Sequence, residues 1–163
     1  MHTLDKLIQT LVKILVFVGG VALVVMICLT CANIFFRLVW FPIRGTFEFM
    51  GYFGAVVTAF ALAYTEVKKG HIAVDVVVSG FSRKTRKYLQ VVNSFVYFLF
   101  FATAAWHIAG KASNLRKTGE VTETLQVIYY PFTYAVALGF GVLALVLLVN
   151  AVKSLSPEKE HST

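Results

Sequence analysis

A basic stretch at the middle of the chain, residues 65–87, separates two pairs of long apolar segments, and this order constrains the fold more than any other feature. The stretch holds six of the fifteen Lys and Arg residues. Within it, residues 72–82 are largely apolar apart from Asp75, but eleven helical residues reach only ~16 Å, about half of a ~30 Å hydrocarbon core. We therefore expect a short amphipathic segment at about residues 70–82 to lie at the membrane surface between the second and third spans.

The composition excludes a soluble globular protein. Of the 163 residues, 58% are hydrophobic and 14% are charged, and the mean hydropathy is +0.77, which leaves too little polar material to cover a soluble fold. The net charge of +7 is compatible with nucleic-acid binding, but the basic residues flank apolar runs and form no face of their own. Anionic lipid headgroups are therefore the expected partners, and we expect a single all-α integral membrane domain over residues 1–163.

Four segments are long and apolar enough to cross a membrane as helices. They are predicted at about residues 14–36, 47–65, 88–110 and 131–152. A short amphipathic lead-in before the first span is expected to lie along the membrane surface, and Thr46 is the predicted N-cap of the second span. We expect an exposed loop at residues 111–123 and a polar C-terminal tail at residues 153–163.

The distribution of Lys and Arg predicts the topology. Four spans place both termini on the same side as the basic central stretch. That side carries ten basic residues, against five on the other: Lys6, Lys13, Lys68, Lys69, Arg83, Lys84, Arg86, Lys87, Lys153 and Lys159, against Arg37, Arg44, Lys111, Arg116 and Lys117. Because basic loops stay in the cytoplasm, both termini are predicted to be cytoplasmic.

The residues expected of common membrane enzymes and pumps are missing from this pattern. None of the four predicted spans has a charge at its middle, where a transport pathway or proton relay would place one. The four histidines, His2, His71, His107 and His161, fall at termini or predicted interfaces, which argues against haem ligation inside a bundle. No phosphate loop, metal-ligand cluster or nucleophile triad is evident, and Cys28 and Cys31 are interpreted as packing residues. We expect a non-catalytic protein without cofactor or metal.

Several polar and small residues are candidates for contact with another subunit. Asn33 and Arg37 lie one turn apart and could pair with Glu48, with a partner or with phosphate. Glu48 could equally be a partner of its own helix dipole, and Glu66 follows it on the same face five turns later. A stripe of small residues at spacings of four permits close helix approach: Gly51, Ala55, Ala59 and Ala63.

Three blocks of sequence resemble one known family. The segments NIFFRLVW (33–40), TFEF (46–49) and KKGHIAVDVV (68–77) are similar to signature blocks of the small membrane subunit of tripartite ATP-independent periplasmic transporters, the DctQ-like family. Gly70, His71 and Asp75 form the most specific part, and the likeness covers nearly the whole chain. Many relatives have a Trp and paired acidic residues where this chain has Thr46, Phe47 and Glu48.

The resemblance implies a non-catalytic subunit of the bacterial inner membrane. It would belong to a sodium-coupled secondary transporter of organic acid anions, bracing a large membrane subunit and helping to receive a periplasmic substrate-binding protein. It implies no substrate site on this chain, so the transported acid stays open. A membrane anchor or cytochrome-like subunit of an oxidoreductase, and a small dimeric exporter, are the alternatives.

From the residues, two sets of contacts are expected. His71 and Asp75 would share a helical face and order the surface segment. The candidate subunit interface comprises Asn33, Arg37, Glu48, Gly51, Ala55, Ala59, Glu66, His71 and Asp75. Lys111, Arg116 and Lys117, called the docking cations below, could meet an acidic patch on the substrate-binding protein.

Overall fold

The computed structural model describes residues 2–39, 41–68 and 83–155, and these ranges contain four helices. They are α1 (His2–Val39), α2 (Thr46–Val67), α4 (Arg83–Thr118) and α5 (Tyr130–Leu155). Each contains a segment long and apolar enough to cross a membrane. The predicted all-α membrane fold with four spans is confirmed. The predicted surface segment at about 70–82, with His71 and Asp75, lies outside the described residues, as do residues 156–163 of the predicted tail.

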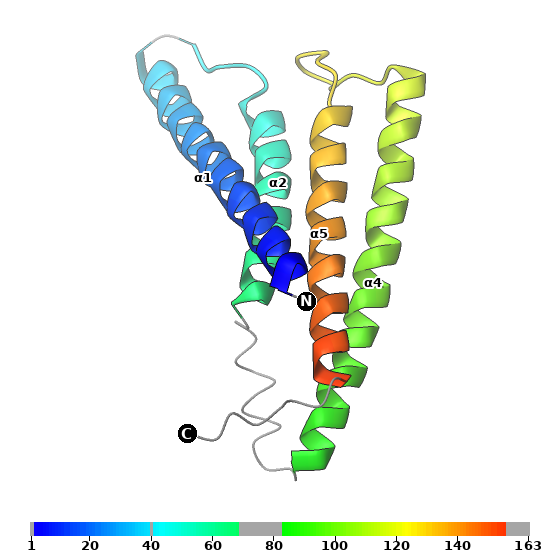
Figure 1. The fold of residues 1–163 in the computed structure, drawn as a ribbon. Coiled ribbons are helices and arrows are strands. Elements are labelled where there is room, and N and C mark those ends of the chain that lie inside the picture. Colours follow the sequence, from blue (N-terminus) through cyan, green and yellow to red (C-terminus); the bar gives the residue numbers. More distant parts are fainter. Residues whose placement is uncertain (1, 40, 69–82, 156–163) are drawn as a thin grey trace.

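The helices stand in the order α1, α2, α5, α4 across the molecule (Figure 1). α2 packs on α1 and α5, and α4 packs along α5, so α2 and α5 form the centre and the other two helices form the edges. α1 and α4 run in one direction and α2 and α5 in the other. We call the end that carries residues 41–45 and the 119–129 loop the loop end. The opposite end, where α1 begins and α2 and α5 finish, is the terminal end.

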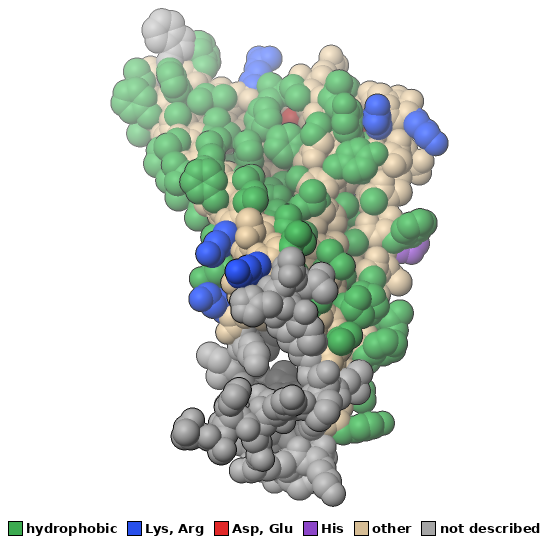
Figure 2. Space-filling view, in the orientation of Figure 1, with side chains coloured by type: hydrophobic (Ala, Val, Ile, Leu, Met, Phe, Trp, Pro, Cys, Tyr) green, Lys and Arg blue, Asp and Glu red, His purple; other side chains and the backbone are tan. Residues whose placement is uncertain are grey.

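The edge helices are much longer than the central ones. α1 has 38 residues and α4 has 36, which correspond to ~57 Å and ~54 Å of helix, whereas α2 has 22 and α5 has 26, or ~33 Å and ~39 Å. Figure 1 shows α4 extending beyond α2 at the terminal end, and α1 inclined across α2. Hydrophobic side chains cover most of the flank seen in Figure 2, with Lys and Arg side chains near the loop end and lower on the side of α1.

The amphipathic lead-in predicted to lie along the membrane surface is the first part of α1. Ile8, Val12 and Leu15 are buried in the core and recur at helical spacing on one face. They pack in the same cluster as Phe60 of α2 and Leu147 of α5. α1 passes through Lys13, taken as a boundary, because Lys is a good helix former, and it continues without a break to Val39. The place of the lead-in relative to the membrane stays a prediction.

The small-residue stripe of α2 is divided between two environments. Ala59 and Ala63 are buried, at 1% and 0% exposure, while Gly51 and Ala55 are exposed. Ala59 meets Gly139 of α5, where an added Cβ would lie 3.0 Å from the Ala59 Cβ and 3.1 Å from its carbonyl carbon. A Cβ at this position would require α2 to shift by a few tenths of an ångström, so the missing side chain of Gly139 permits the close approach of the two central helices.

Two predicted boundaries differ from the structure. The N-cap of α2 is Gly45, with φ +74° and no side-chain cap, while Thr46 is buried inside the first turn and its hydroxyl donates to the Ile43 carbonyl at 2.8 Å. The expected loop at 111–123 begins eight residues later, because α4 continues to Thr118 and ends at Gly119, with φ +66°. The docking cations therefore lie on the last turns of α4.

Candidate functional site

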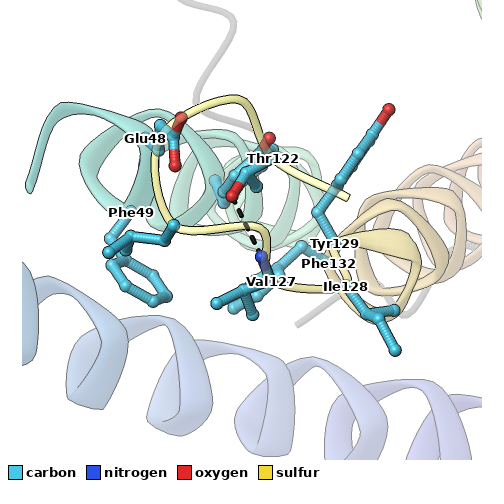
Figure 3. A pocket seen from close by; sticks show the side chains of 9 residues that line it. Glu48, Phe49, Thr122, Val127, Ile128, Tyr129 and Phe132 are labelled. Carbon is cyan, nitrogen blue, oxygen red and sulfur yellow. Dashed lines mark hydrogen bonds between the residues drawn. The ribbon is translucent and has the colours of Figure 1, made fainter. Parts of the chain in front are cut away.

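At the loop end, α2 is joined to the loop between α4 and α5. The Glu48 Oε1 atom, in the first turn of α2, accepts a hydrogen bond of 2.7 Å from the backbone N–H of Thr124. The two residues are 76 positions apart in the chain. An added Cβ on Gly45 would clash with the side chain of Leu125, so the loop also packs closely against the turn before α2. We call this contact the Glu48 junction (Figure 3).

The loop is ordered by its own hydrogen bonds. Val121 and Ile128 form an antiparallel bridge. Inside it, the Thr122 N–H donates to the Val127 carbonyl at 3.0 Å, and the Thr122 hydroxyl accepts from the Val127 N–H at 3.2 Å (Figure 3). Thr122 is 7% exposed. Glu48 therefore holds a preformed turn in place and does not have to fold a flexible segment.

Aromatic rings continue the junction between the helices. The Tyr52 ring of α2 stacks on Tyr129 and Phe132, with ring centroids 5.3 Å and 5.5 Å away. The Tyr129 hydroxyl donates to Glu120 Oε2 at 3.0 Å. This hydrogen bond to the carboxylate raises the pKa of Tyr129 above its ordinary value. The Tyr129 hydroxyl is protonated at neutral pH like any tyrosine, and the raised pKa keeps it a donor to Glu120 at higher pH as well.

The cavity at this junction is too small for a substrate. Its volume is about 10 Å³, which is room for at most one water molecule. The second carboxylate oxygen of Glu48, Oε2, is buried and has no hydrogen-bond partner among the described residues. Within the described part of the chain, no group of three or more His, Cys, Asp or Glu side chains could hold a metal. The geometry is that of a structural joint.

Asn33 closes the connection between α1 and α2. Its Oδ1 atom accepts a hydrogen bond of 2.8 Å from the backbone N–H of Ile43 in the turn that follows α1. Arg37, one turn further along α1, is exposed. Of the two residues predicted to act together, Asn33 contacts its own chain. The contact of Arg37 with a partner or with phosphate stays a prediction.

At the terminal end, α2 and α5 are joined by a second polar contact. Glu66 is 8% exposed, and its Oε1 atom accepts a hydrogen bond of 3.0 Å from the Asn150 side chain. Sequence reasoning did not single out Asn150. Its signal was nevertheless available, because it is the lone amide side chain in the apolar part of α5, and such residues form interhelical hydrogen bonds in membranes.

The other predicted contact residues that the structure describes lie on the surface of the chain, and their contacts with another subunit stay predictions. Gly51 and Ala55 face outward on the loop-end half of α2, and the docking cations are exposed on α4. His107 was predicted at the interface that ends the third span, but α4 continues for eleven residues beyond it, so it lies well inside the helix.

The chain matches a family model, described as "Tripartite ATP-independent periplasmic transporters, DctQ component", over residues 26–156. The matched range includes the Glu48 junction, the Glu66–Asn150 contact and all of α2 and α4. No curated protein and no solved structure matches the chain.

Proposed function

The chain belongs to the DctQ family of tripartite ATP-independent periplasmic transporters, and we propose that it is the non-catalytic small membrane subunit that braces the large transport subunit. The complete transporter would be a sodium-coupled secondary transporter of organic acid anions in the bacterial inner membrane. The large subunit would carry the solute, and a periplasmic protein would deliver it.

The fastening of α2 to its neighbours at both ends is the observation that carries the bracing role. At the loop end, Glu48 binds the loop that leads into α5; at the terminal end, Glu66 binds Asn150; between them, Gly139 brings the two backbones together. A scaffold that supports a moving subunit must resist shear between its own helices. This pair of helices is held against such sliding by polar contacts at two levels.

The orientation follows from the distribution of basic residues. Lys6, Lys13 and Lys68 lie toward the terminal end, while Arg44 and the docking cations lie toward the loop end. With the positive-inside bias of ten to five, the terminal end and both termini are cytoplasmic in our proposal. The loop end would then face the periplasm and present the exposed docking cations to the binding protein. Complementary charge on the binding protein would accelerate its docking.

The candidate interface residues divide into two roles in this proposal. Arg37, Gly51 and Ala55 are exposed and would contact the large subunit directly, and His71 and Asp75 would contribute from the surface segment. Asn33, Glu48, Ala59 and Glu66 contact their own chain, so they would act by fixing the shape that the partner meets.

Reconstitution tests this function. Proteoliposomes with an inward sodium gradient would contain the large subunit and its binding protein, with or without this chain, and uptake of candidate organic acids would be measured. We expect uptake and co-purification of the large subunit only when this chain is present. Full uptake without the chain would contradict the bracing role, and a haem spectrum from the purified chain would favour the oxidoreductase anchor instead.

A further inference from the structure

The outer half of α4 carries polar side chains on the face turned away from α5. Thr103, His107, Lys111 and Asn114 are all exposed, and their spacings of four, four and three place them on one face of the helix. We call this the α4 polar face. Beside it, Ala112 and Leu115 are buried, at 0% and 5% exposure, on the side of α4 that packs on α5.

Contacts on either side of His107 fix its depth. Ser113 of α4 shares a hydrogen bond of 2.9 Å with the Tyr134 hydroxyl of α5, and the rings of Phe101 and Phe140 lie 5.6 Å apart. These two contacts align the antiparallel helices. His107 is halfway between Phe101 and Ser113 along α4, so it lies level with the point of α5 halfway between Phe140 and Tyr134.

That level is near the middle of the central helices. It lies two residues, ~3 Å, from the level at which Gly139 of α5 approaches Ala59 of α2. Ala59 is eleven residues, ~16 Å, from Glu48 and seven residues, ~10 Å, from Glu66. His107 therefore lies at the depth of the hydrocarbon core as α2 defines it, on the outside of an edge helix.

Lipid is a poor environment for this side chain. Because α4 runs toward the loop end and helical side chains tilt toward the N-terminus, His107 leans away from the headgroups at the loop end. Lys111 is one turn closer to the loop end and has a long stem that can extend toward it. The Thr103 hydroxyl is satisfied by the carbonyls of Leu99 and Phe100, but His107, Lys111 and Asn114 have no side-chain hydrogen bond within the described residues.

We propose that the α4 polar face is covered by the large membrane subunit, which supplies carboxylate or carbonyl oxygens to His107 and Lys111. This proposal rests on the proposed function, because the proposed function names the large subunit as the partner of this chain. α4 has room for a neighbour, since α5 covers one side of it. A second copy of the chain fits poorly, because pairing two such faces would set cationic Lys111 against the same face of its copy.

Photo-crosslinking in the complete transporter tests the contact. Benzoylphenylalanine would replace His107 in the full chain, co-expressed with the large subunit, and membranes would be irradiated before purification. We expect an adduct between this chain and the large subunit. An adduct with a second copy alone, or no protein adduct while the large subunit still co-purifies, would overturn the inference and leave the proposed function standing.

A pair of substitutions tests the chemistry. His107→Leu removes the hydrogen-bonding groups, whereas His107→Gln keeps a donor and an acceptor. We expect Leu to reduce the large subunit recovered per chain about threefold or more, the factor that matches an average side-chain hydrogen bond between membrane helices, and Gln to keep most of it. Equal recovery with both variants would contradict the inference. If the unmodified chain recovers no large subunit, the proposed function itself fails.

Discussion

Replacing Gly139 with Ala should separate the two central helices. The new methyl group would lie 3.0 Å from the Ala59 Cβ and from the Phe60 ring, and 3.1 Å from a backbone carbon of α2. The backbone cannot rotate away as a flexible side chain can, so the helices must move apart. Overpacking of this kind costs ~1–3 kcal/mol of the free energy of unfolding.

Gly141 supplies the matched control, because it lies two residues along the same helix and an added Cβ there meets nothing within 4 Å. Both substitutions gain the same helix propensity, ~0.5–1 kcal/mol. The difference between the Gly139→Ala and Gly141→Ala variants therefore isolates the steric cost, and we expect the Gly139 variant to be less stable by ~1–3 kcal/mol.

Thermal unfolding of the purified chain in detergent, followed by circular dichroism, measures the difference. We expect the Gly141→Ala variant to unfold at or above the temperature of the unmodified chain, and the Gly139→Ala variant to unfold below it. Equal unfolding temperatures for the two variants would refute the claim that the backbones of α2 and α5 meet at Gly139.

Three further predictions follow from the polar contacts. Replacing Glu48 with Ala should speed hydrogen exchange at the Thr124 amide, while Glu48→Gln, which keeps an acceptor, should preserve its protection; unchanged exchange in both would contradict the junction. Asn150→Leu should lower the free energy of unfolding by ~0.6–1.7 kcal/mol, measured by the same thermal assay, and Leu148→Ala on an exposed face should cost less. Changing the three docking cations to Ala should raise the KM for the loaded binding protein at low salt and have little effect at high salt; identical uptake kinetics at both would argue against docking there.

The sequence predicted the number and order of the spans because helix length and hydropathy are local properties. For α2, the structure runs from Thr46 to Val67 where the sequence placed a span at 47–65. The edge helices were placed less well, because Lys and Arg were taken as boundaries. These residues are good helix formers, so α4 passes through Lys111 and stops only at Gly119, whose positive φ ends the helix.

The polar contacts could not be predicted in the same way. Glu48 was recognised as a candidate, but its partner is a backbone N–H 76 residues away, and a backbone donor has no signature in the sequence. Asn33 was expected to face another helix or a partner and instead binds the Ile43 amide of its own turn. The depth of His107 was missed because it depends on the register between α4 and α5, which is fixed by packing.

The unequal helix lengths mean that this protein does not meet the bilayer as a slab of uniform thickness. The apolar part of α1, residues 14–36 between Lys13 and Arg37, is ~35 Å long, so burying it in a ~30 Å core requires a tilt of roughly 30° or local thickening of the lipid. The part of α2 between Glu48 and Glu66 is ~26 Å long and fits nearly upright. The strain of hydrophobic mismatch therefore falls on one edge of the molecule. Lipids with longer acyl chains should relieve that strain, and the membrane around this subunit should be thicker on the side of α1 than along its centre.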